Sequence, residues 1–155
     1  MALALLVISL LLVVMVAAPA VAQLRLGNLL GLIDIQGTLF CTGNGNPNSS
    51  SVSTPVFPNA AVQLQCGNTG TFVSSTTTNY AGVFKIFLDP LTMLLSSLLS
   101  DCKLVVNTPL TNCNSVLPIG ILQSPLQFLG RTLLWVLGIV NIGAAGFSLV
   151  PSNLE

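Results

Sequence analysis

The sequence predicts an all-β fold, an antiparallel β-barrel or sandwich with one short α-helix, in a secreted and disulfide-stabilised domain. Apolar and mixed residues alternate with period two in 61–66 and 83–88, which is typical of half-buried strands. Four cysteines follow an apolar N-terminal run in a short chain, a combination typical of small secreted proteins.

Charge restricts the classes of function. The chain has 155 residues, which suits one domain, and its formal net charge is zero. Charged residues make up 5% of it, against about a quarter in ordinary domains, and there is no basic patch, so nucleic-acid binding is excluded. All the charged residues follow residue 22: Arg25, Asp34, Lys85, Asp89, Asp101, Lys103, Arg131 and Glu155.

Residues 1–22 are predicted to be a signal peptide, which leaves 23–155 as a single domain. The apolar run 3–16 is too short for a membrane span, Pro19 breaks it, and residues 20–22 fit a small-x-small cleavage site. A buried N-terminal helix is the alternative, and it is disfavoured because the run has no polar face for solvent.

The cysteines Cys41, Cys66, Cys102 and Cys113 predict two disulfides, and at this point every connectivity stays open. Zinc is not indicated, because the chain has no histidine and no Cys-x-x-Cys spacing. Free buried thiols are the alternative, which an oxidising compartment disfavours.

The first strand is predicted over 33–41, where apolar and polar residues alternate, after the apolar segment 23–32, which has no clear period. Residues 42–54 are rich in Gly, Asn and Ser and predict a solvent loop. Asn48 begins a glycosylation sequon in this loop. The loop resembles a phosphate-binding loop only superficially, because it lacks a lysine and a following helix.

The stretch 57–88 is predicted to be the middle of the sheet. Val62 and Leu64 mark the apolar face of one strand, and Phe84 and Ile86 mark that of another. A glycine-containing turn and a Thr/Ser-rich segment separate them, and residues 79–82 supply turn chemistry before the second strand.

A short helix is predicted from Asp89, a good N-cap, and Pro90, a good first helical residue. We interpret it as closing one end of the barrel. A membrane-active amphipathic helix is the alternative, and it is disfavoured because the polar face has no lysine or arginine. The apolar stripe has helical spacing and comprises Leu91, Leu94, Leu95, Leu98 and Cys102.

After the helix, residues 103–108 predict a strand and 109–114 a loop. A short strand is predicted over 117–122, where Pro118 indicates an edge position.

The region 126–150 is very apolar and punctuated by glycines. A transmembrane helix is disfavoured by those glycines and by Asn141, and a GPI-attachment signal is disfavoured by the polar final residues. We predict two strands instead, 131–140 and 146–150, joined by a glycine turn.

Catalytic chemistry is not indicated. The lack of histidine excludes Ser-His and Cys-His nucleophilic catalysis. Paired carboxylates are limited to Asp34, Asp89, Asp101 and Glu155; we assign Asp89 to a helix cap, Glu155 to a frayed end, and the other two to ordinary surface positions. The sequence therefore predicts no enzyme, no metal site and no cofactor.

The low charge has a consequence of its own. A surface of Ser, Thr, Asn and apolar atoms adsorbs to apolar phases and favours self-association. We expect the mature protein to partition onto a waxy or lipid surface, such as a cuticle or a microbial surface.

Three segments resemble the pollen Ole e allergen and extensin family of plants. Residues 36–41 resemble its Gly-x-Val-x-Cys strand, with Leu39 in place of the valine, and 58–66 and 77–84 are similar to later blocks. Within that family the chain is most similar to the phylloplanins. The residues that carry this likeness are 95–102, 104–110, 113–114, 124–128 and 141–142.

The resemblance implies a compact Greek-key β-barrel secreted by plant cells. Members often have six cysteines, and here Asn44 stands where a second cysteine often follows Cys41, while a C-terminal cysteine is also missing. These two differences match the loss of one bridge. By order and spacing within the family, the remaining pairs are Cys41–Cys113 and Cys66–Cys102.

The resemblance also implies a function, that of a leaf-surface defence protein that inhibits germination of fungal or oomycete spores. It implies an extracellular location, on the leaf surface or in the apoplast, without a transmembrane anchor. It transfers no catalytic or binding residue. Two other functions stay open: a cell-wall structural or growth-related extensin-like protein, and a carrier of an apolar small molecule.

Overall fold

The structure is a computed structural model that describes residues 31–49, 53–90, 94–134 and 137–151, and it confirms the predicted all-β fold class. The predicted signal peptide lies outside the described residues, as do Leu91, Glu155 and Ser50 of the sequon. The elements are β1 (Leu32–Thr38), β2 (Ala61–Cys66), β3 (Thr71–Thr77), β4 (Val83–Leu88), α2 (Leu95–Asp101), β5 (Cys102–Val106), η1 (Leu110–Asn112), β6 (Gly120–Leu134), β7 (Leu137–Ala144) and β8 (Ser148–Pro151).

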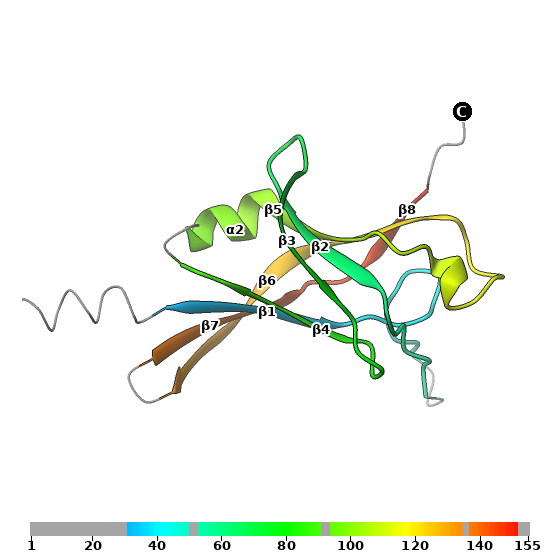
Figure 1. The fold of residues 1–155 in the computed structure, drawn as a ribbon, viewed down its shortest axis with the longest axis horizontal. Helices are drawn as coiled ribbons and strands as arrows, with labels where there is room; N and C mark the ends of the chain where they lie inside the picture. Colours follow the sequence, from blue (N-terminus) through cyan, green and yellow to red (C-terminus); the bar gives the residue numbers. More distant parts are fainter. Residues whose placement is uncertain (1–30, 50–52, 91–93, 135–136, 152–155) are drawn as a thin grey trace, which may run out of the picture.

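The strands form one sheet in the order β3-β2-β5-β6-β7-β1-β4, with β8 added to β6. The end strands β3 and β4 contact each other, so the sheet curls into a nearly closed barrel (Figure 1). Most neighbours are antiparallel, as predicted, but β1 and β7 run parallel, with Ile33 opposite Val140. Because β4 and β5 are distant in the sheet order, the chain crosses over between them, and α2 lies in this crossover.

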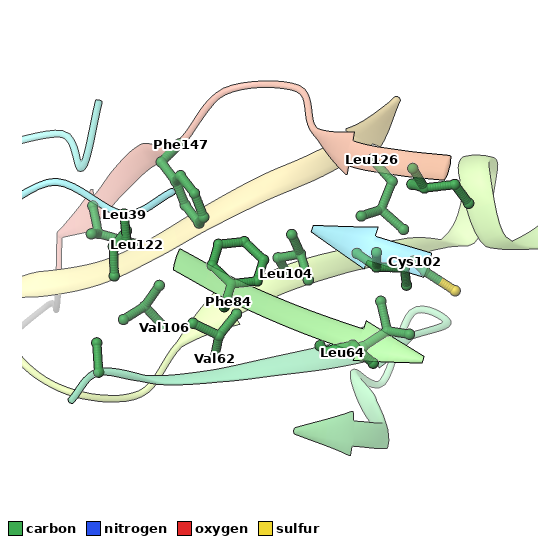
Figure 2. Packing of buried hydrophobic residues seen from close by; sticks show 14 of the residues in the cluster. Leu39, Val62, Leu64, Phe84, Cys102, Leu104, Val106, Leu122, Leu126 and Phe147 are labelled. Atoms are coloured by element: carbon green, nitrogen blue, oxygen red, sulfur yellow. The ribbon is translucent and has the colours of Figure 1, made fainter. Parts of the chain in front are cut away.

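The interior is filled by apolar side chains from both halves of the sheet. Val62 and Leu64 of β2 and Phe84 and Ile86 of β4 are at most 3% exposed, so the predicted alternation is confirmed. Figure 2 shows Phe147, from the connection between β7 and β8, pointing towards Phe84. Their ring centroids are 6.3 Å apart at an interplanar angle of 76°, an edge-to-face pair that adds about 0.5–1.5 kcal/mol to simple burial.

Two disulfides join parts of the barrel that are distant in the sequence. Cys66 and Cys102 are cross-strand partners on β2 and β5, with their Cα atoms 4.0 Å apart. Cys41 follows β1 and is bonded to Cys113 just after η1, with a Cα–Cα distance of 6.0 Å. These are the pairs that the family resemblance implies.

The helix begins later than the sequence predicts. Its first residue is Leu95 and its N-cap is Leu94, so the assignment of Asp89 as the cap is wrong. The strand β4 continues to Leu88, which is buried, and this places Asp89 at a strand end instead. The predicted apolar stripe is confirmed at Leu98, which is fully buried, whereas Leu94 is 72% exposed.

Strand boundaries near the C-terminus also differ. The sequence predicts one strand over 131–140, whereas β6 ends at Leu134 and β7 returns antiparallel to it from Leu137. The sequence does not reveal the turn between β6 and β7, because the residues of both strands next to it are apolar. The predicted edge strand over 117–122 is instead the start of β6, which pairs with β5 on one side and β8 on the other. Pro118 precedes that strand and so forces no edge position.

The predicted turn at 79–82, before β4, is confirmed, but the strand β3 that precedes this turn was not predicted. Asn79 Oδ1 accepts hydrogen bonds from the backbone N–H groups of Ala81 and Val83, at 2.9 and 3.0 Å. Gly82 has a φ of 76°, which favours glycine. The Thr/Ser-rich segment forms β3, which pairs with β2 and whose Thr residues suit an exposed edge strand.

Candidate functional site

A large apolar surface lies where β6 and β7 leave the barrel. We call residues 128–134 of β6 and 137–141 of β7 the projecting hairpin. Residues 139–141 still pair with β1, and the far part of the hairpin extends past one end of the barrel (Figure 1). Along the inward-facing side of β6, exposure rises from 7% at Leu126 to 47% at Phe128 and 79% at Leu133. The face that forms the core inside the barrel therefore continues into solvent.

This face carries a hollow of about 340 Å³, lined by Arg131, Leu133, Gly138, Ile139 and Val140. Leu133 lies opposite Gly138, and both residues line the hollow. Within the described residues the guanidinium of Arg131 makes no ion pair or hydrogen bond. An apolar hollow with one unpaired cation at its rim suits an amphiphile that carries an anionic group.

The other face of the hairpin is ordered by local contacts. Asn141 Nδ2 donates a hydrogen bond to Thr132 Oγ1 at 2.8 Å. Leu129 is the unpaired residue of a β-bulge, and its side chain covers Gly143 so closely that a Cβ there would lie 2.8 Å from it. The bulge lies in the pairing of β6 with β7 and twists β6 locally. This twist discourages the addition of another strand at the unpaired edge of β6.

Asp34 does not occupy the ordinary surface position that the sequence predicts, because it is only 7% exposed. Its strand lies between β4 and β7, and neighbouring side chains on both sides shield it. The Nζ atom of Lys85 lies 4.0 Å from Oδ2 of Asp34, and the lysine side chain is 53% exposed. The Oδ1 atom has no hydrogen-bond partner among the described residues.

The remaining candidate carboxylates do not assemble with Asp34. Asp89 follows β4 and Asp101 ends α2, and both are exposed. Across the described ranges, no three His, Cys, Asp or Glu side chains gather as a metal site. Each cysteine is held in a disulfide, so the described part of the chain has no free thiol.

The predicted glycosylation residue, Asn48, is exposed in the connection between β1 and β2. Its backbone N–H donates to Thr54 Oγ1 at 3.0 Å. Its side-chain amide makes no hydrogen bond to the described residues. The attachment of a glycan stays a prediction.

A second hollow, of about 460 Å³, lies between the β1–β2 and β7–β8 connections. One of the polar side chains that line it, Asn46, is already used by Phe147. Its Nδ2 donates to the carbonyl of Phe147 at 2.7 Å, and its Oδ1 accepts from the backbone N–H of Phe147 at 2.9 Å. The predicted solvent loop is therefore anchored, with Thr42 and Gly45 buried within it. This hollow is a gap between fastened loops.

The projecting hairpin was missed as a surface, although the sequence carries a signal of it. Arg131 is the only charged residue between Lys103 and Glu155, and it interrupts the very apolar region. Arginine is rarely buried without a partner, so Arg131 indicates where the apolar region meets solvent.

Among the described helices, none is both long and apolar enough to cross a membrane.

This chain is similar to one protein family, to a sequence relative and to a solved structure. The phylloplanin family, described as phylloplanin antifungal protein, matches residues 29–154. Phylloplanin from Nicotiana tabacum is 38% identical over 143 residues, which cover 90% of this chain and 90% of that protein. The crystal structure of the major plantain pollen allergen is 16% identical, covers 78% of this chain and 98% of that chain, and has a TM-score of 0.36. The fold class itself rests on the strands and registers described above.

Proposed function

The chain belongs to the phylloplanin family, and from this membership we propose that it is a secreted plant defence protein that inhibits germination of fungal or oomycete spores. The observation that carries the proposal is the family match over residues 29–154, which includes every described strand.

The surface supports this role at a boundary between leaf and water. Large apolar side chains are exposed at several places on the barrel, including Phe72 at 57% and Phe87 at 56%. With only eight charged residues in the chain, few ionic groups oppose adsorption to an apolar phase. We propose that the protein spreads on the cuticle or on a microbial surface after export.

The proposal includes the processing of the chain. Residues 1–22 act as a signal peptide, and residues 23–155 form the mature domain on the leaf surface or in the apoplast. The domain acts without catalysis and without a cofactor. Mass spectrometry of the N-terminal peptide of the exported protein tests this, since the mature chain is expected to begin at Gln23, as glutamine or as its cyclised pyroglutamate form.

A germination assay tests the function. Spores of a leaf pathogen are incubated with the purified mature protein, and the germinated fraction is counted against dose. We expect germination to fall with dose, and we expect a reduced and alkylated sample to be much weaker, because the barrel depends on its disulfides. Full germination at a saturating dose of folded protein would reject the defence function.

The two other functions predicted from the sequence are separable by experiment. Recovery of the protein in a leaf water wash favours the surface protein, whereas retention in the salt-washed wall fraction favours an extensin-like role. A carrier needs an enclosed apolar cavity, and the described core is occupied by fully buried side chains such as Phe57, Leu104 and Ile142.

A further inference from the structure

We propose that the projecting hairpin is a docking site for bilayers that contain anionic phospholipids. In this arrangement Leu133 enters the boundary between headgroups and acyl chains, and Arg131 binds a lipid phosphate. The inference goes beyond the proposed defence function and does not rest on it, because binding to a bilayer is measured without spores.

The first argument is the continuity of the apolar face. The row that begins at the core with Leu126 ends at Leu133, the most exposed member of the row. Val140 packs against the core, and Leu133, which lines the same hollow, is exposed. Burial of the exposed part of Leu133 is favourable wherever an apolar medium can reach it.

The second argument selects the medium. On the bilayer side of Arg131 the hairpin carries apolar side chains from both strands, with Leu133 on one face and, by the alternation along β7, Ile139 on the other. A folded protein partner covers one face of a ribbon, whereas acyl chains surround the end of a ribbon from all sides. The apolar end of a bilayer leaflet therefore satisfies both faces at once.

The third argument sets the depth. Beyond Leu126, β6 pairs with β7 alone, so one edge of its backbone has no strand partner among the described elements. Unpaired N–H and C=O groups are costly in hydrocarbon, which stops the hairpin at the interface, where water still reaches them. Interfacial segments enter about 5–10 Å, and two strand residues span roughly 7 Å, so Arg131 lies at phosphate level when Leu133 is inserted.

The fourth argument is charge. Arg131 has no partner in the described residues, and no acidic residue follows it before Glu155. A planar guanidinium binds phosphate oxygens in a fork geometry and tolerates partial burial. The site therefore combines an apolar contact with one cationic contact, which is the chemistry of an anionic phospholipid.

The test is flotation of the mature protein with two kinds of vesicle, phosphatidylcholine alone and phosphatidylcholine mixed with phosphatidylglycerol. We expect binding to both, with about fivefold tighter binding to the anionic vesicles, because one basic residue near such a surface contributes about that factor. Added salt is expected to remove the difference while leaving the apolar part of the binding.

Three variants locate the site. Arg131→Gln is expected to abolish the preference for phosphatidylglycerol, and Leu133→Asn to weaken binding to both vesicles at least tenfold, since a leucine side chain is lost from the apolar contact. Val116→Asn is the matched control, because Val116 is 83% exposed but lies in the connection before β6, and its binding is expected to equal that of the wild type. Circular dichroism of each variant establishes that it is folded.

Several outcomes would overturn the proposal. Equal weakening by Val116→Asn and Leu133→Asn would indicate unspecific adsorption. Failure of the wild type to float with either vesicle would exclude a bilayer as the occupant. A wild-type dimer that Leu133→Asn converts to a monomer would identify a second copy of the chain as the occupant instead. By contrast, loss of vesicle binding in Arg131→Gln and Leu133→Asn with normal inhibition of germination would support the docking site and show that the defence function is independent of it.

Discussion

The two halves of β6 have similar apolar sequences and different environments. In the first half, Leu122 and Ser124 are at most 2% exposed, and the strand has β5 on one side and β8 on the other. In the second half β7 is the only paired neighbour, and exposure reaches 79% at Leu133. Burial along this strand is therefore decided by how many neighbours flank it, because the residue types themselves scarcely change.

The difference separates stability from interaction within one element. Both disulfides lie in the barrel, and neither includes a residue of the projecting hairpin. Changes in the barrel should lower the free energy of unfolding, whereas changes in the hairpin should alter contacts with other phases. The following predictions are ordered from the largest expected effect to the smallest.

The largest effect is expected from the double substitution Cys41→Ser with Cys113→Ser. The bond closes a long loop, with a sequence separation of 72, and its loss should lower the free energy of unfolding by roughly 4 kcal/mol as an upper figure. Chemical denaturation followed by far-ultraviolet circular dichroism measures this. Non-reducing peptide mapping of the wild type should first recover the Cys41–Cys113 and Cys66–Cys102 peptides. A Cys102–Cys113 peptide would contradict the pairing.

The sharpest comparison is Leu122→Ala against Leu133→Ala, the same change in the two halves of β6. Leu122 is 2% exposed, so its truncation leaves a cavity and should cost about 3 kcal/mol. Leu133 is 79% exposed, and its truncation should change the free energy of unfolding by less than about 0.5 kcal/mol. Similar losses for both variants would show that the hairpin is part of the cooperative core, and the comparison would fail.

A smaller effect is expected from changes to Asp34 on β1 and Lys85 on β4, since β1 lies beside the hairpin strand β7. Lys85→Met should lower the free energy of unfolding by about 0.5–1 kcal/mol, because it leaves the buried Asp34 carboxylate without its nearby cation. Asp34→Asn should cost less than this, because it removes the buried charge itself. A double-mutant cycle measures the coupling between the two residues. A coupling well above 1 kcal/mol would mean that the pair is closer in solution than 4.0 Å.

The smallest effect is expected from Asn48→Gln. The β1–β2 connection that contains Asn48 lies at the opposite end of the barrel from the projecting hairpin (Figure 1). The variant should lose the mass of one glycan when expressed in a plant host, with unfolding changed by less than about 0.5 kcal/mol and vesicle binding unchanged. A wild-type mass equal to that of the bare mature chain would contradict glycosylation at this site.

Alternation in the sequence was sufficient to predict the strands that have one buried face. Val62, Leu64, Phe84 and Ile86 were placed on the core side, and all four are buried. The burial of Asp34 was not predictable in this way, because it depends on neighbours from β4 and β7 that only the fold brings together. Local pattern records which face of a strand is apolar, but not what stands beside it.

The helix start and the C-terminal hairpin were predicted wrongly for related reasons. Asp89 and Pro90 are good local signals for a helix, but the pairing of β4 with β1 up to Leu88 takes precedence over them. The apolar region after Leu126 was predicted to be strand, but its turn and its exposed end were not. Both features follow from long-range pairing, which no window of neighbouring residues contains.

The parallel pairing of β1 with β7 also constrains the order of events during biosynthesis. Residues 32–38 are among the first of the domain to emerge, yet their partner at 137–144 is made nearly last. The barrel therefore cannot close until residues 137–144 have been synthesised, and until then β1 has one edge unpaired. Such late closure is typical of slowly folding β proteins, and Cys66 and Cys102, which lie on strands made before β7, can form their bond before the sheet is complete.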